Sequence, residues 1–131
     1  MAFQVKNTGR DAFMDGLNNW MGNGCSLEVW TSGYGTKLCT WTMGGSTKVY
    51  AASSGGVLTM NAPSAATVAA VATGTMGVMQ IKDSGGNVVM KDFTVGTSGA
   101  DFIVDNVSVN SGQNVTLQYA SSTLTAPNAG F

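Results

Sequence analysis

From Gly24 onward, short stretches of alternating apolar and polar residues are separated by glycine-rich turns. The stretch at residues 26–31 places Leu27 and Val29 on one face and Glu28 and Trp30 on the other, which is the two-residue period of a strand. The Gly-Gly pair at residues 85–86 is typical of a tight hairpin turn, because glycine readily adopts positive φ. No helical period interrupts these stretches. They therefore predict a mostly β fold, an antiparallel sandwich or jelly-roll-like body, and not a parallel sheet with crossover helices.

The alternation predicts nine strands. They are expected at residues 26–31, 37–43, 47–51, 57–60, 74–83, 87–95, 101–104, 107–109 and 114–119. Residues 61–73 allow two interpretations: the alanines permit a helix, whereas the valines, threonines and the following glycine favour an extended crossover. We expect the extended form.

One amphipathic helix precedes the strands. Apolar residues recur on one face at helical spacing, namely Phe13, Leu17, Trp20 and Met21. Asn7 or Thr8 can cap this helix, and Gly-Asn-Gly at residues 22–24 ends it. A helix of about three turns is not stable alone in water, so it must pack against another part of the protein or against a partner. We expect residues 1–24 to be a helix and entry segment packed on a β-sandwich body, residues 25–131, with a C-terminal arm. Together they form a single domain.

Charge and missing residue types exclude several functions. The 131 residues contain no histidine, and 6 basic residues against 7 acidic ones give a net charge of −1. Nucleic-acid binding requires clustered Lys and Arg, so no nucleic-acid partner is expected. Histidine is the commonest general base and metal ligand, and no nucleophile elbow, phosphate loop or Cys-x-x-Cys pair is present. We expect no enzyme, no catalytic residue, no cofactor and no metal.

The acidic residues nevertheless need individual interpretation. Asp11 and Asp15 lie at helix spacing, which is typical of a solvated face or of acidic residues in a first turn that favour the helix dipole. Glu28 is expected to be an exposed strand charge. Asp101 and Asp105, with the asparagine that follows, offer oxygen ligands that Ca²⁺ prefers, but their spacing matches no calcium loop and ordinary turn chemistry is expected instead.

Cysteine placement and apolar runs bear on the compartment. A hairpin centred near Tyr34 sets Cys25 opposite about residue 43 and Cys39 opposite about residue 29. The thiols then do not face each other, so reduced cysteines are expected, with a disulfide as the alternative. The first residues contain no apolar run typical of a signal peptide, and no run is long enough for a membrane span. Folding in a cytosol, with no membrane partner, is the expectation.

Three aromatic residues lie close together in the predicted hairpin. If Leu27 and Val29 face the core, Trp30 faces outward, with Tyr34 at the turn and Trp41 on the adjacent strand. Large exposed rings suggest a contact surface, and such rings also stack on sugars. Burial of these rings under the helix or a neighbouring chain is favoured over a sugar site.

Several segments in order along the chain carry a resemblance to a known family. They are residues 26–33 (Ser-Leu-Glu-Val-Trp-Thr-Ser-Gly), 38–43 (Leu-Cys-Thr-Trp-Thr-Met), 55–60 (Gly-Gly-Val-Leu-Thr-Met), 81–89 (Ile-Lys-Asp-Ser-Gly-Gly-Asn-Val-Val), 95–101 (Val-Gly-Thr-Ser-Gly-Ala-Asp), 107–117 (Val-Ser-Val-Asn-Ser-Gly-Gln-Asn-Val-Thr-Leu) and 124–128 (Leu-Thr-Ala-Pro-Asn). The chain resembles, over nearly its whole length, small virion proteins of tailed bacteriophages. Some members look like capsid decoration (cement) proteins with a jelly-roll-like β-fold. Two departures are the Met-Gly-Val-Met-Gln-Ile stretch at residues 76–81, where members often carry Trp-Phe-Arg, and a loop at residues 32–36 without the usual proline.

This resemblance implies a non-enzymatic structural protein. It would bind and stabilise the outer surface of a tailed-phage capsid, with the major capsid protein as partner, as a homo-oligomer (dimer or trimer), on virions assembled in the host cytoplasm. The alternatives are another virion component, such as a tail, connector or fibre-associated protein, and a carbohydrate-binding β-sandwich module. The partner-contact residues we expect are Phe13, Leu17, Trp20, Trp30, Tyr34, Trp41, Leu124 and Phe131.

Overall fold

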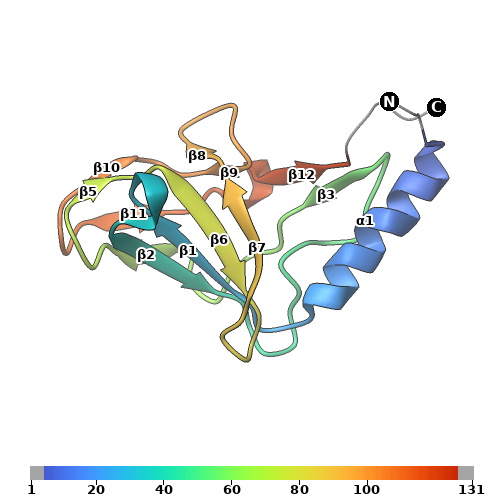
Figure 1. The fold of residues 1–131 in the computed structure, drawn as a ribbon, viewed down its shortest axis with the longest axis horizontal. Coiled ribbons are helices and arrows are strands. Elements are labelled where there is room, and N and C mark those ends of the chain that lie inside the picture. Colours follow the sequence, from blue (N-terminus) through green and yellow to red (C-terminus); the bar gives the residue numbers. More distant parts are fainter. Residues whose placement is uncertain (1–4, 127–131) are drawn as a thin grey trace.

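A computed structural model describes residues 5–126, in which one α-helix precedes a series of short strands (Figure 1). The elements are α1 Asn7–Met21, β1 Ser26–Trp30, the 3₁₀ helix η1 Ser32–Tyr34, β2 Lys37–Thr42, β3 Val57–Thr59, β4 Thr67–Ala69, β5 Gly74–Thr75, β6 Val78–Lys82, β7 Val88–Phe93, β8 Val95–Gly96, β9 Phe102–Ile103, β10 Ser108–Val109, β11 Asn114–Thr116, the 3₁₀ helix η2 Tyr119–Ser121 and β12 Thr123–Thr125. The predicted mostly β class with one N-terminal helix is confirmed.

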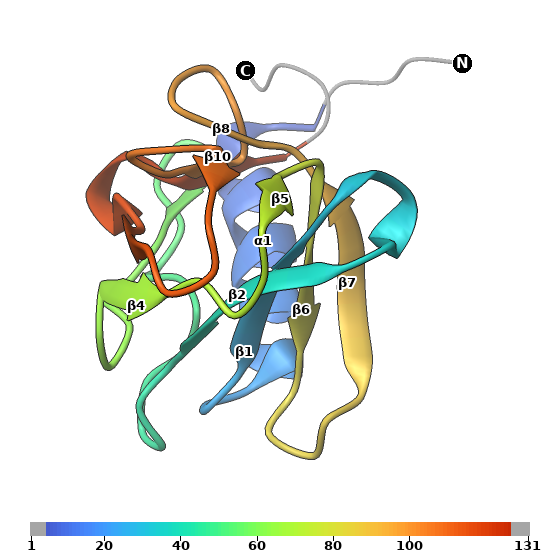
Figure 2. The same ribbon diagram turned by 90° about the vertical axis from the view of Figure 1, so that its left-hand side faces the viewer.

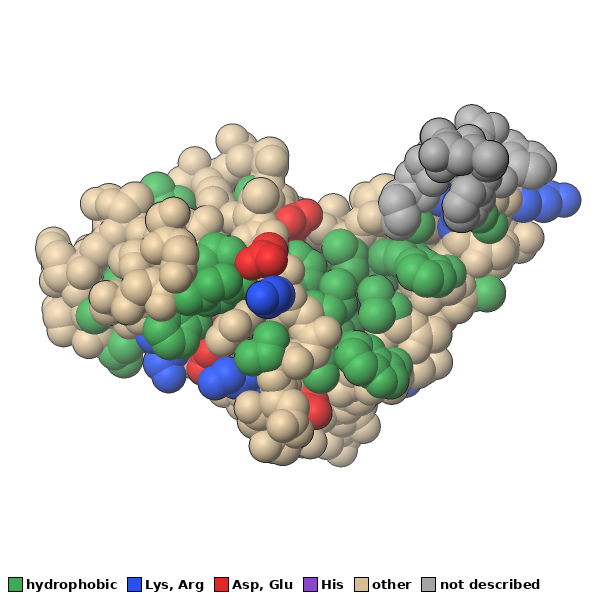
Figure 3. Space-filling model, in the orientation of Figure 1, with side chains coloured by type: hydrophobic (Ala, Val, Ile, Leu, Met, Phe, Trp, Pro, Cys, Tyr) green, Lys and Arg blue, Asp and Glu red, His purple; other side chains and the backbone are tan. Residues whose placement is uncertain are grey.

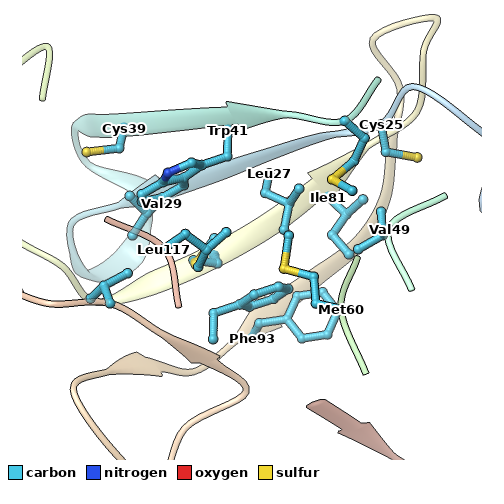
Figure 4. Close-up of a cluster of buried hydrophobic side chains, with 14 of the residues drawn as sticks. Cys25, Leu27, Val29, Cys39, Trp41, Val49, Met60, Ile81, Phe93 and Leu117 are labelled. Carbon is cyan, nitrogen blue, oxygen red and sulfur yellow. The ribbon is translucent and has the colours of Figure 1, made fainter. Parts of the chain in front are cut away.

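The largest sheet has four antiparallel strands in the order β2-β1-β6-β7. Leu27 on β1 lies opposite Trp41 on β2 and Ile81 on β6, so these three side chains share the inner face. All three are 0% exposed. Figure 4 shows them directed toward Met60, Phe93 and Leu117. Phe93 is the last residue of β7, and Met60 and Leu117 directly follow β3 and β11. The inner face of this sheet is therefore one wall of the core.

Short strand pairs build the opposite wall (Figure 2). Three are antiparallel, β3–β12, β4–β11 and β5–β10, and the fourth, β8–β9, is parallel. Their inward side chains include Leu58, Phe102 and Val115, each 0% exposed. The rings of Phe93 and Phe102 meet edge to face at 5.2 Å, a favourable aromatic geometry. The two walls thus close on a single apolar core.

Helix α1 is held to the body by polar side chains as well as by Met14 and Met21, which are buried in the core. The Asn18 side chain donates to the Tyr50 carbonyl at 2.7 Å and accepts from the Tyr50 amide at 3.3 Å. Asp11 accepts from the Gly56 amide at 2.7 Å, and Arg10 donates to the Ala126 carbonyl at 3.0 Å. These bonds satisfy loop and strand-end groups that have no ladder partner. They fix the rotation of the helix about its own axis.

Several predicted strands are shorter or differently paired. The expected strand at residues 74–83 divides at Gly77, where an added Cβ would lie 2.5 Å from the Ser32 backbone nitrogen, because η1 crosses there. The expected strand at residues 87–95 ends at Phe93, and residues 47–51 form only isolated bridges. Residues 61–73 are extended and contain β4, as expected, whereas β12 was not predicted. Such two- and three-residue strands carry too little alternation to be recognised.

The cysteine register is confirmed. Cys39 lies opposite Val29, and the Met43 amide donates to the Cys25 carbonyl at 2.8 Å. Both thiols are free and buried, and Figure 4 places them at opposite ends of the view. No helix in the described residues is long and apolar enough to cross a membrane.

Candidate functional site

The outward side of α1 carries an exposed apolar ridge. Phe13 is 61% and Trp20 63% exposed, and the half-buried Leu17 lies between them at helical spacing. We call Phe13, Leu17 and Trp20 the helix ridge. On the face shown in Figure 3, hydrophobic side chains gather over α1 and between α1 and β7. The ridge belongs to the molecule's surface and not to the joint between helix and body.

The buried stripe of α1 is a different one. It consists of Arg10, Met14, Asn18 and Met21. Of the apolar residues expected to form the docking face, only Met21 is fully packed against the body. Asp11 and Asp15 are also not a solvated face, because they accept hydrogen bonds of 2.6 Å from the Ser53 hydroxyl and amide, respectively. The helix therefore docks by Met14, Met21 and polar anchors, and leaves its aromatic residues exposed.

Two expected contact residues lie elsewhere. Trp41 is 0% exposed, since its register opposite Leu27 turns it inward, and its Nε1 donates to the Ala66 carbonyl at 2.9 Å. The prediction of Trp41 as a surface contact is therefore wrong. Leu124 is half-buried in β12 opposite Leu58, so residues 123–125 are a strand and not the start of an arm. Phe131 lies outside the described residues.

Trp30 and Tyr34 do meet on the outer face of the central sheet. Their rings are 6.2 Å apart at 65°, edge to face. Trp30 is half-buried and its Nε1 donates to Glu28 Oε1 at 3.3 Å. The Trp30 ring therefore packs against one side of the Tyr34 ring. The Trp30 Nε1 group is not available to a ligand, because it already donates to Glu28.

Glu28 is the centre of a buried polar cluster, and the prediction of an exposed strand charge is wrong. It is 4% exposed, because side chains of β2 and β6 cover it. Gln80 Nε2 donates to Oε1 at 2.8 Å, and the ammonium groups of Lys82 and Lys37 lie 3.4 and 3.6 Å from Oε2. Burial alone raises the pKa of the Glu28 carboxyl, but these donors and cations outweigh it and hold the pKa below its ordinary value. Glu28 is ionised and neutralised in place.

Tyr34 is tied to the far edge strand. Its hydroxyl donates to Asp92 Oδ1 at 2.9 Å and accepts from the Asp92 amide at 2.8 Å. Both residues have positive φ, 59° for Tyr34 and 66° for Asp92, and they are the non-glycine residues of the described chain with that property. Such a conformation costs about 1 kcal/mol or more for an L-residue. The two hydrogen bonds hold each strained residue against the other.

A bulge in β7 makes this contact possible. Between the pairs Met79–Phe93 and Ile81–Met90, strand β7 contains one residue more than β6. A bulge redirects the side chains next to it, and such irregularities are frequent beside functional sites. Here the extra residue lies in the Lys91–Asp92 segment, beneath the Tyr34 hydroxyl.

Between Tyr34 and β7 lies a groove of about 490 Å³, which we call the outer-face groove. It is lined by Tyr34, Gln80, Val88, Val89, Met90 and Lys91. A second, more polar hollow of about 600 Å³ lies near the C-terminal end of α1 and is lined by Asn23, Ser46, Thr47, Lys48, Tyr50, Asn61 and Ala62. No residue of this second hollow was singled out from the sequence.

The acidic loop considered for Ca²⁺ has ordinary structural roles. Asp101 Oδ2 accepts from the Thr94 amide at 2.9 Å, Asp105 Oδ1 from the Thr116 amide at 3.0 Å, and Asn106 Oδ1 from the Ser108 amide at 3.1 Å. Within residues 5–126, no group of three His, Cys, Asp or Glu side chains is placed to hold a metal ion.

Compared with known proteins, the chain matches no family model, no curated protein and no solved structure.

Proposed function

We propose that this chain is a non-enzymatic structural protein of a tailed-phage virion, a decoration protein that binds the outer capsid surface through the helix ridge. The virion assignment rests on the sequence resemblance. The observation that carries the contact surface is the exposure of Phe13 and Trp20, at 61% and 63%, on a helix that is otherwise firmly anchored.

Exposed aromatic pairs are unusual on a surface that contacts only water. Trp is among the residues most enriched at interface hot spots, and clustered apolar exposure marks interaction sites. Each aromatic side chain has a surface of roughly 200 Å², of which about six-tenths is exposed. Covering this exposed surface on both residues contributes about 6 kcal/mol to the binding free energy, before the costs of association are subtracted. This contribution is large enough to affect the affinity for a capsid surface.

The anchoring of α1 supports the same role. Asn18, Asp15 and Asp11 each hold the helix to the 50–56 segment. A ridge fixed before binding loses little conformational freedom on contact, so more of the contact energy appears as affinity. A ligand that binds only the intact shell stabilises it by mass action.

The low charge predicts how the contact behaves in salt. With a net charge of −1 and no ion pair on the ridge within the described residues, attachment depends on shape and apolar burial. Exposed ion pairs are screened by salt, whereas apolar contact is not weakened in this way. Shell binding is expected to change little between low and high ionic strength.

Co-sedimentation with purified capsids of the phage that encodes the chain tests this proposal. The double variant Phe13→Ser/Trp20→Ser removes the ridge, and Val71→Ser is the matched control because Val71 is an equally exposed apolar residue, at 65%, away from α1. We expect wild type and Val71→Ser to bind alike, and the double variant to bind at least tenfold more weakly with an unchanged circular dichroism spectrum. Equal occupancy of all three proteins would contradict the ridge as contact surface.

A further inference from the structure

We propose that the outer-face groove binds a carboxylated sugar, such as a hexuronic or nonulosonic acid. This site is separate from the helix ridge and does not depend on the capsid role. The groove combines an aromatic side chain, an apolar floor, an amide and a cation within one hollow on the outer side of β6 and β7.

The size and lining fit a small ligand. A volume of about 490 Å³ lies within the range of small-molecule sites, which are mostly apolar with a few placed polar groups. Val88, which is 48% exposed, supplies apolar surface, and Tyr34 supplies an aromatic ring. A pyranose ring has an apolar face of C–H groups that packs on an aromatic ring, and hydroxyls around its edge that require hydrogen bonds.

The polar groups of the groove are divided between structure and surface. Gln80 uses Nε2 to donate to Glu28, and its Oε1 remains as an acceptor for a hydroxyl. Glu28 is neutralised by Lys37 and Lys82, and Asp92 accepts from Tyr34. The ammonium groups of Lys37 and Lys82 outnumber the Glu28 carboxylate, whereas Asp92 is exposed and keeps its negative charge.

Lys91 gives the groove its charge preference. Lys37 and Lys82 are engaged with Glu28, whereas Lys91 is exposed and has no ion-pair partner in the part of the chain that the structure describes. Lys37, Lys82 and Lys91 together outnumber Glu28 and Asp92, three cations to two anions, so the net charge around the groove is positive. It favours a carboxylate on the ligand over a neutral sugar.

The wall that carries Tyr34 is built at a conformational cost. Tyr34 and Asp92 both have positive φ and are joined by two hydrogen bonds across β6. Gly77 has no side chain where η1 crosses β6, which allows the loop to reach the bulge of β7. Strained residues that the surrounding structure holds in place are concentrated at binding and active sites. The groove therefore has one pre-formed wall, which loses little conformational freedom when a ligand binds.

Titration of the intact protein followed by amide chemical shifts tests the proposal. The probes are N-acetylneuraminic acid and glucuronic acid, with glucose as the neutral sugar and acetate as the bare anion. We expect saturable shifts at Tyr34, Gln80 and residues 88–91 with the two acidic sugars, and at least tenfold weaker binding of glucose and acetate.

Two matched variants locate the charge. Lys91→Met is expected to weaken binding of the acidic sugars at least fivefold, because it removes the groove's free cation while keeping the length of the side chain. Lys48→Met removes a cation from the other hollow and is expected to bind like wild type. Absence of shifts at the groove, equal binding of acetate, or unchanged affinity of Lys91→Met would each overturn the proposal.

Discussion

Trp20 and Trp41 give opposite predictions for the same substitution. Trp41 is 0% exposed and lies between the two walls of the core, whereas Trp20 is 63% exposed on the helix ridge. Replacing each by alanine separates what holds the fold together from what is available for a partner.

The structure sets the two magnitudes. Truncating a buried Trp removes roughly 200 Å² of packed surface, and measured Trp→Ala changes in cores cost about 3–5 kcal/mol. Trp41→Ala also leaves the Ala66 carbonyl without its donor at 2.9 Å, so we expect a loss of about 4–5 kcal/mol. For a domain of this size that corresponds to roughly 15 °C in Tm. Trp20→Ala is expected to change the free energy of unfolding by no more than about 0.5 kcal/mol.

Urea unfolding followed by far-ultraviolet circular dichroism measures both values without using tryptophan fluorescence. A Trp20→Ala protein that lost more than about 2 kcal/mol would show that the ridge belongs to the core. A Trp41→Ala protein that lost less than about 1 kcal/mol would show that the inward register of β2 is wrong.

Three further predictions concern the fold and its titratable groups. Gly56→Ala should lower the free energy of unfolding by at least about 1 kcal/mol more than Gly55→Ala. Both glycines have positive φ, but only at Gly56 would the new Cβ lie 2.7 Å from the Arg10 guanidinium carbon. Equal losses in urea titrations would argue against a fixed Arg10. The pKa of Glu28 lies below its ordinary value of 4.5, so its ion pairs stabilise the fold above that pH and are lost as the pH falls below it. In Glu28→Gln, the free energy of unfolding should therefore fall less steeply at acid pH than in wild type. An unchanged acid pH dependence would count against the cluster. Burial raises the pKa of Cys39 to about 11. At pH 8 its thiol should therefore react with a thiol reagent only when the protein unfolds, which mass spectrometry would show. Rapid labelling of the native protein would contradict its burial.

The central hairpin could be predicted because alternation and turn glycines act locally. The faces of β1 and the opposition of Cys39 to Val29 follow from a two-residue period and a turn near Tyr34. The burial of Glu28 could not be foreseen in this way, because Gln80, which covers it, is 52 residues away in the sequence. Local pattern gives a side chain's face but not what covers that face.

The rotation of α1 was ambiguous in the sequence for a related reason. The ridge and the buried stripe both follow helical spacing, so periodicity alone cannot choose between them. The stripe that is buried contains Arg10 and Asn18, which a hydrophobicity pattern assigns to the surface. Their hydrogen bonds to Ala126 and Tyr50, distant in sequence, decide the outcome.

The groove is likewise a product of distant segments. Tyr34 was singled out as an aromatic turn residue, but its partner Asp92 is 58 residues away and sits in a bulge without a sequence signal. Lys91 was not singled out at all. Only the folded sheet brings these residues together.

Imaging of the purified virion by cryo-electron microscopy tests the proposed role most directly. The proposal predicts density that fits this β-body at repeated positions over the outer capsid surface, with α1 and its ridge against the shell. Density for the protein confined to the tail or a single vertex, or its absence from the virion, would contradict it.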